Sequence, residues 1–259
     1  MSQLRNLLFH HGGVSPIPSQ YIVAEYIQIA TNQYIDTGVA AIPRYTRSLF
    51  DVYWVGSATG TRGLFGVRST STTNSNSYNV FLVVGGVGPR WDNTGDSTSS
   101  SSWTPGERHV VELTHTPEGY GQAIDNGVVA ATGSIAMSTG LREYIHLNTI
   151  YTISNASVNT GGTTRWYSCK IWQDGTVLTA DMIPVYDTIT QAGGMYDVVR
   201  QQFYGGSNPD GNTIVAYDAN DDPITGGNLL GMSPNLLMMS NKKSKLNVTM
   251  IGPDEEEER

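Results

Sequence analysis

Cysteine is nearly absent from this chain, charged residues are scarce, and long apolar runs are missing. The single cysteine, Cys169, excludes an internal disulfide framework, and its place within an apparent strand favours a small core residue over a nucleophile. No run approaches the roughly 18 apolar residues that span a bilayer, so membrane insertion is not expected. Charged residues make up 15% of the 259 residues, and the formal net charge is −8. Because an acidic surface repels phosphates, nucleic-acid binding is not expected either.

Turn formers and strand formers are what the chain has in abundance. It contains 29 Gly and 14 Tyr, with many Ser, Thr and Asn. The pair Asn126-Gly127 predicts a tight type I′ hairpin turn, and similar turn signals recur at short intervals. The clearest strand-like segments between these turns are residues 47–55, 78–84, 108–114 and 164–172. No convincing helical stripe is found before residue 190, so the pattern predicts a β-sandwich or barrel.

The two ends of the chain depart from this pattern. Residues 1–20 combine a short amphipathic piece with glycines and prolines, which favours a docking arm, with a frayed terminus as the alternative. The apolar side chains expected to make assembly contacts there are Leu4, Leu7, Leu8 and Phe9. The segment has no signal-peptide pattern, so synthesis in a cytosol is expected. Residues 206–259 are predicted to form an extension with an acidic tail.

Several phrases between these ends occur in a familiar order. They span residues 25–28, 33–38, 65–68, 77–81, 167–175, 181–185 and 194–204. Together they cover about residues 21–205 and resemble the concanavalin A-like (laminin-G-like) domains of bacteriophage structural proteins and gut-bacterial surface proteins. The resemblance implies an all-β fold, an antiparallel jelly-roll sandwich with N- and C-terminal extensions. It implies less about function, because the same sandwich serves lectins, glycosidases, adhesion modules and virion parts.

Catalysis is not expected, and no catalytic residue is predicted. Glycoside hydrolysis, the nearest enzymatic alternative, requires two carboxylates roughly 5–10 Å apart across the scissile bond. Laminarinase-like members of the family carry them on a Glu-x-Asp-x-x-Glu strand, which this sequence lacks. The strand acids Glu25, Asp51 and Glu112 stand alone, and the five histidines are scattered. No nucleophile elbow or phosphate-binding loop occurs.

The tryptophans are the candidate recognition residues. Trp166 and Trp172 share strand parity, whereas Cys169 has the opposite parity and is expected in the core. With Trp54 and Trp91, they are predicted to form an outward aromatic surface. Such a surface suits either stacking on a sugar ring or an interface between subunits, a place in the core is the further alternative, and the sequence leaves all three open.

A calcium site is the only cofactor hypothesis that the sequence supports. Many laminin-G-like domains bind calcium through loop carboxylates and carbonyl oxygens. The densest acidic cluster outside the tail contains Asp218, Asp221 and Asp222, whose oxygens suit a hard cation. A solvated acidic turn without metal is the alternative.

These observations favour a non-catalytic bacteriophage virion protein, such as a head fibre, a decoration protein or a tail-associated protein. It would be made in the host bacterial cytoplasm and reside on the virion. Other virion proteins, copies of itself in a symmetric homo-oligomer, and a cell-surface glycan are the expected partners. The alternative is a carbohydrate-binding lectin module that is not on a virion, and a glycoside hydrolase is less favoured.

Overall fold

A computed structural model describes residues 17–55, 62–69, 77–83, 86–91, 106–137, 139–153, 157–174, 176–207 and 211–226. Within these ranges the regular structure consists of β-strands, without an α-helix, which confirms the predicted all-β class. None of these residues belongs to a helix long and apolar enough to cross a bilayer. The chain divides into two units, Met1–Ile224 and Thr225–Arg259, and all of the strands that the structure describes belong to the first.

Among the described residues, the larger sheet has 11 strands. Its main path runs, in spatial order, through β10 (Val128–Ala136), β9 (Tyr120–Asp125), β8 (Arg108–His115), β4 (Arg47–Trp54), β14 (Thr164–Gln173), β15 (Val177–Asp187), β16 (Ala192–Asp197) and β17 (Gln202–Gly205). Three short strands join this path: β1 (Tyr21–Val23) pairs with β15, β2 (Tyr26–Ile29) with β14, and β18 (Val215–Tyr217) with β2.

The smaller sheet has seven strands in the part of the chain that the structure describes. Its main path runs through β13 (Ser157–Thr160), β12 (Thr149–Thr152), β5 (Arg62–Arg68), β11 (Glu143–Leu147) and β3 (Ile35–Ala41). Beside β5 lies β6 (Ser77–Val83), which in turn pairs with β7 (Gly86–Trp91). These pairs are antiparallel except for β12 with β5, which run parallel.

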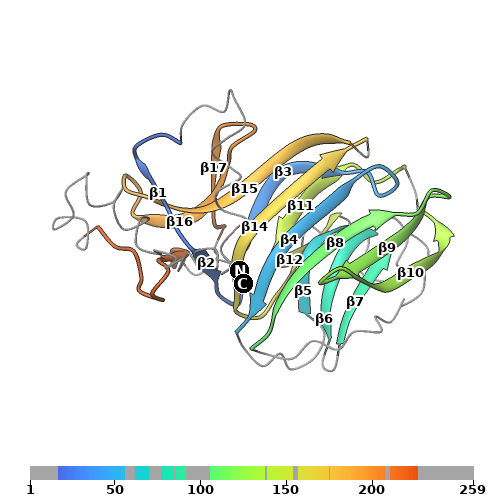
Figure 1. Ribbon diagram of the computed structural model, residues 1–259, viewed down its shortest axis with the longest axis horizontal. Coiled ribbons are helices and arrows are strands. Elements are labelled where there is room, and N and C mark those ends of the chain that lie inside the picture. Colours follow the sequence, from blue (N-terminus) through green and yellow to red (C-terminus); the bar gives the residue numbers. More distant parts are fainter. Residues whose placement is uncertain are drawn as a thin grey trace, which may run out of the picture. The chain divides into compact units, whose positions relative to one another are not determined.

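The core lies between the two sheets. Strand β4 alternates strictly between buried and half-buried positions, as its sequence pattern predicts. Its Phe50 ring stacks on Phe65 of β5, with ring centroids 4.6 Å apart. The Tyr78 hydroxyl of β6 crosses the core and donates a hydrogen bond to Ser48 Oγ of β4 at 2.9 Å. The two layers can be followed in Figure 1, where β4 and β8 lie in front of β5 and β12.

The predicted hairpin turn at Asn126-Gly127 is confirmed. Both residues have positive φ angles, 49° and 83°, and they form the two-residue connection between β9 and β10. The flanking residues Asp125 and Val128 are directly paired, which is the geometry of a type I′ hairpin.

The predicted outward orientation of Trp166 is wrong. Strand β14 has a register shift between Trp166, which lies opposite Val52, and Ser168, which lies opposite Asp51. This β-bulge inserts one extra residue and reverses the side-chain alternation on its far side. As a result Trp166 is 0% exposed, while Cys169 is also in the core, as expected.

The larger sheet continues past residue 205, where the sequence pattern placed the end of the sandwich. Strand β18 pairs with β2 through residues 215–217, and the Gly193 amide of β16 donates to the Ile214 carbonyl at 2.8 Å. Ile214 and Ala216 are buried in the core. Residues 211–224 are therefore part of the sandwich unit and not of a separate extension.

Candidate functional site

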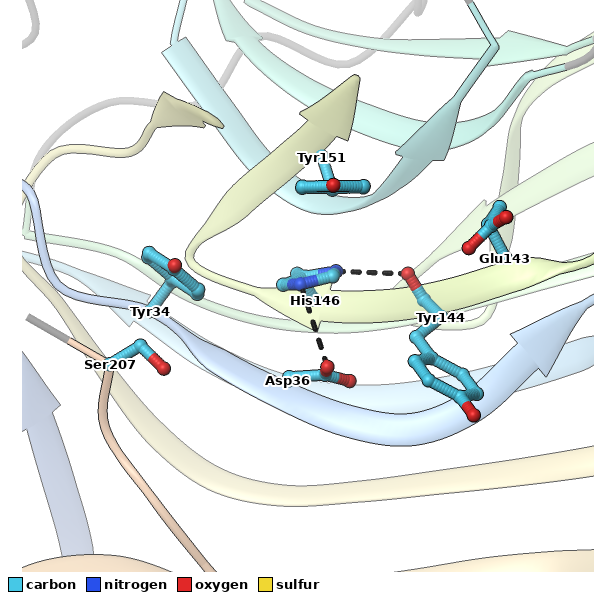
Figure 2. Close-up of a pocket in the computed structure, with 7 residues that line it drawn as sticks. All are labelled: Tyr34, Asp36, Glu143, Tyr144, His146, Tyr151 and Ser207. Atoms are coloured by element: carbon cyan, nitrogen blue, oxygen red, sulfur yellow. Dashed lines mark hydrogen bonds and ion pairs between the residues drawn. The ribbon is translucent and has the colours of Figure 1, made fainter. Parts of the chain in front are cut away.

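An open hollow of about 280 Å³ lies on the smaller sheet, and Figure 2 shows its lining. Strands β3, β11 and β12, together with residues just before β3 and just after β17, supply the side chains. They are Tyr34, Asp36, Glu143, Tyr144, His146, Tyr151 and Ser207. In β3, buried Ile35 and Val39 flank half-buried positions such as Asp36, so the hollow lies on the face turned away from the core.

His146 is the centre of this site. Its side chain is only 7% exposed, although it lies on the outer face of the sheet. The Tyr151 ring stacks on the imidazole at a centroid distance of 5.0 Å and an interplanar angle of 15°. Tyr34 packs at a tilt on the imidazole, 5.5 Å away. Two aromatic side chains thus bury the imidazole and leave its nitrogen atoms as the polar part.

The two nitrogens of His146 have different surroundings. Nδ1 lies 2.9 Å from the Tyr144 carbonyl oxygen. Because a carbonyl oxygen can only accept, Nδ1 carries the proton of the neutral ring, and Nε2 is then an acceptor. Nε2 faces Asp36 Oδ2 at 3.9 Å, as the dashed line in Figure 2 shows. Two acceptors therefore face each other across a gap too wide for a direct hydrogen bond.

Burial lowers the pKa of His146 from its ordinary value of 6.5. Loss of hydration disfavours the charged ring, and this effect outweighs the opposing influences of Asp36, the Tyr144 carbonyl and Glu143, which raise the pKa. The imidazole is consequently neutral at pH 7, and the acceptor character of Nε2 holds under physiological conditions.

An irregular stretch of β3 positions Asp36. Opposite Tyr144 stands Ala40, but opposite His146 stands Asp36, so two steps along β11 match four along β3. Within this bulge the Gly38 amide donates to Asp36 Oδ1 at 2.8 Å. That contact occupies one carboxylate oxygen and leaves Oδ2 directed at His146.

Arg200 stabilises the same bulge through its backbone carbonyl groups. Its guanidinium donates to the carbonyl oxygens of Thr37 at 2.6 Å and Gly38 at 3.1 Å, and it also pairs with the buried carboxylate of Asp197. These two hydrogen bonds satisfy bulge carbonyl oxygens that a regular strand ladder would otherwise engage. The geometry of Asp36 therefore depends on a residue more than 160 positions later in the chain.

Ser207 reaches the hollow through a bridge between the two sheets. It pairs with Tyr34 in an isolated antiparallel bridge, in which the Ser207 amide donates to the Tyr34 carbonyl at 2.8 Å and the Tyr34 amide donates back at 3.3 Å. This bridge joins the segment after β17 to the segment before β3, and it sets the Tyr34 side of the hollow.

The tryptophans that the sequence suggested lie away from this hollow. Trp54 and Trp166 are buried in the core and offer no surface to a sugar or a second subunit. Trp172 is half-buried, and the Arg47 guanidinium lies 4.4 Å from its ring centroid. Trp91 ends β7, and its side chain lies outside the described residues. No common aromatic surface forms from the three whose side chains the structure describes.

The acidic cluster near the end of the unit makes internal bonds. Asp221 accepts from the Tyr26 hydroxyl at 2.6 Å and from Arg165 at 3.2 Å. Asp218 Oδ1 accepts from the backbone amides of Asn220 and Asp222, which closes the turn. In the described part of the chain no three His, Cys, Asp or Glu side chains converge in a way that could hold a metal ion. The predicted calcium arrangement of Asp218, Asp221 and Asp222 is therefore not found.

The predicted assembly residues, Leu4, Leu7, Leu8 and Phe9, lie outside the described residues. Conversely, the sequence pattern does not mark the residues of the hollow as a site. A signal was present, because Tyr144 and His146 stand at the i, i+2 spacing that puts side chains on one face of a strand, and Tyr34 and Asp36 show the same spacing. What the sequence lacks is any sign that these two pairs meet.

No protein-family model and no curated protein matches the chain. Solved structures of similar architecture include a Bacteroides ovatus protein with a provisional carbohydrate-binding assignment, at 14% identity and a TM-score of 0.47 over 79% of this chain. The chain spans 62% of the length of that protein.

Two further similar structures are a heptameric SAP-like pentraxin from Limulus polyphemus and the CBM40 module of a Ruminococcus gnavus IT-sialidase bound to α2,3-sialyllactose. The pentraxin is 9% identical, with a TM-score of 0.43 over 57% of this chain and 76% of its own. The module is 12% identical, with a TM-score of 0.41 over 56% of this chain and 89% of its own. These similarities are too distant to assign a ligand to the chain.

Proposed function

We propose that this protein is a non-catalytic carbohydrate-binding module and that the hollow between β3, β11 and β12 is its sugar site. The observation that carries the proposal is the gap of 3.9 Å between His146 Nε2 and Asp36 Oδ2. Both atoms accept hydrogen bonds, so the gap suits a ligand that brings a donor. Sugars present many such donors around one ring.

The walls of the hollow support the same conclusion. Three tyrosines, Tyr34, Tyr144 and Tyr151, line it, and Tyr144 is half exposed. Aromatic rings with a polar tip bind the apolar faces of a sugar while their hydroxyls reach its oxygen atoms. A volume of about 280 Å³ lies at the small end of ligand pockets, which suits one sugar unit of a longer glycan.

Binding assays on three proteins test the proposal. We expect the wild type to bind at least one glycan on an array, and we expect Tyr151→Ala to weaken that binding about tenfold, the equivalent of about 1.4 kcal/mol. Trp172→Ala is the matched control, because it removes an aromatic ring that lies elsewhere on the unit. Each variant is checked for an unchanged thermal unfolding midpoint.

Three results would contradict the proposal: no glycan bound by the wild type, equal binding by wild type and Tyr151→Ala, or loss of binding only in Trp172→Ala. The last result would instead place the sugar contact at Trp172. Release of reducing ends from a bound polysaccharide would contradict the non-catalytic part.

The place of this module on a bacteriophage particle remains a prediction that rests on the family resemblance. This prediction includes virion partners, a symmetric homo-oligomer and residence on the virion. Capsid or tail genes beside the coding gene, and an oligomer in light scattering, are the expected observations. Neighbouring genes for polysaccharide uptake together with a monomer would favour a lectin module that is not on a virion.

A further inference from the structure

Resting on the proposed sugar site, we infer that the hollow selects a sugar with a free amino group, bound as its ammonium ion between Asp36 and His146, in a lining that also carries the Glu143 carboxylate. The ligand class is thus a non-acetylated amino sugar, either alone or within a glycan. The inference names the chemistry of one substituent and follows from three features of the lining: its hydrogen-bonding character, its charge and its aromatic walls.

The hydrogen-bonding groups at the centre of the site are acceptors. The Asp36 carboxylate accepts only, and His146 Nε2 accepts because Nδ1 donates to the Tyr144 carbonyl at 2.9 Å. A hydroxyl brings one donor and adds acceptor lone pairs of its own. An ammonium brings three donors and no acceptor, so, unlike a hydroxyl, it can bridge the 3.9 Å gap between His146 and Asp36 and have a donor left for a further partner.

The charge of the lining points the same way. Two of its seven residues are carboxylates, and none of the seven is Lys or Arg. A partly enclosed site of this kind attracts a cation and repels an acidic sugar. His146 does not offset this charge at pH 7, since burial lowers its pKa and keeps the ring neutral.

Aromatic faces complete a cation site. Tyr151 and Tyr34 flank the imidazole at centroid distances of 5.0 Å and 5.5 Å, so a group held at Nε2 lies beside tyrosine rings. Ring faces attract an ammonium within about 6 Å, and the attraction grows as the cation loses water. Acetylation of the amine would remove its charge and two of its donors together.

Calorimetric titration with paired oligosaccharides tests the inference. The probes are the tetramers of glucosamine and of N-acetylglucosamine, at pH 7 and 0.15 M salt, so that exposed charges are screened. We expect the wild type to bind the glucosamine tetramer at least tenfold more tightly. Asp36→Asn is expected to bring this preference close to one, because Asn keeps an oxygen that can accept from the Gly38 amide but loses the charge.

Asp174→Asn provides the matched control. It removes the same charge from an exposed hairpin turn, and Asn tolerates the φ of 50° found there. Its preference for the amine should equal that of the wild type. Glu143→Gln is a second test variant, on β11, and should lower the preference even if Asp36→Asn fails to fold.

The outcomes separate this inference from the proposed function. Equal affinity for the two tetramers, a preference for the acetylated one, or an equal loss in Asp174→Asn would overturn the amine selectivity. If Tyr151-dependent binding of neutral glycans persisted in that case, the sugar site would stand without it. If no glycan of any class bound, both would fail.

Discussion

His146 is a titratable side chain held against two tyrosine rings on the outer face of a sheet. The groups that face it are Asp36 from β3, Glu143 and the Tyr144 carbonyl from its own strand β11, Tyr151 from β12 and Tyr34 from the segment before β3. Burial dominates over the two carboxylates and lowers its pKa. A proton on this ring is therefore less favourable in the folded chain than in the unfolded chain.

Folding stability should consequently fall with acid in a way that depends on His146. As the pH falls below 6.5, the ordinary pKa of the group, the unfolded chain binds the proton first, so stability is lost down to the lowered pKa of the folded state. Above pH 7 the imidazole adds no pH dependence to the folding stability. We expect the unfolding midpoint of His146→Gln to fall less between pH 7 and pH 5 than that of the wild type, as measured by calorimetry.

The two midpoint curves should run parallel above pH 7, which serves as the internal control. Equal slopes below pH 6.5 would show that His146 binds its proton equally well in both states, contrary to its burial.

Strand β5 leaves no room for a side chain at Gly66, next to the hollow. Gly66 of β5 pairs with His146 on one side and with Asn79 on the other, and its φ is +117°. A Cβ atom at this position would lie 2.0 Å from the Tyr78 carbonyl oxygen and 2.6 Å from Asn79 Cα. Both are backbone atoms, which cannot rotate away, so the pairing of these strands requires glycine.

Gly66→Ala should therefore cost about 3 kcal/mol or more of unfolding free energy, through overpacking and backbone strain together. Gly127→Ala is the control, because that glycine also has a positive φ, +83°, but an added Cβ would meet no atom within 4 Å. It should cost only about 1–2 kcal/mol. Urea unfolding of the two variants measures the difference. Equal losses of unfolding free energy would mean that the close backbone contacts at Gly66 are unimportant.

At the scale of the molecule, the first unit is complete only with the residues after β17, which add a strand to the larger sheet. Strand β18 adds to β2, and buried Ile214 and Ala216 fill the core beside β16. Asp221 then binds Tyr26 and Arg165, one on β2 and one on β14.

A chain that ends after Ile224 should keep the unfolding midpoint and the glycan binding of the full chain. A chain that ends after Gly205 should be destabilised by about 3 kcal/mol or more, or fail to accumulate, because it loses a buried Ile and Ala and the backbone partners of β2. It would also lack Ser207 of the hollow. Thermal unfolding of the two truncated proteins measures this, and equal midpoints would place the end of the unit at residue 205 after all.

Local patterns in the sequence determined the fold class, the strand β4 and the hairpin at Asn126-Gly127. These features depend on neighbours in the chain: alternation is a property of one strand, and a type I′ turn is a property of two residues. The prediction for Trp166 was wrong because it assumed unbroken alternation along β14. A β-bulge interrupts that alternation, and nothing in the composition of the strand indicates where a bulge lies.

Only the tertiary structure decided where the site is. Asp36 and His146 are 110 positions apart, and they meet because β3 and β11 pair across a bulge whose carbonyl groups accept from Arg200, still further along the chain. Register across such a distance is set by the packing of whole sheets and by contacts to irregular backbone. The sequence contains every residue of the hollow, but their convergence is a product of the fold.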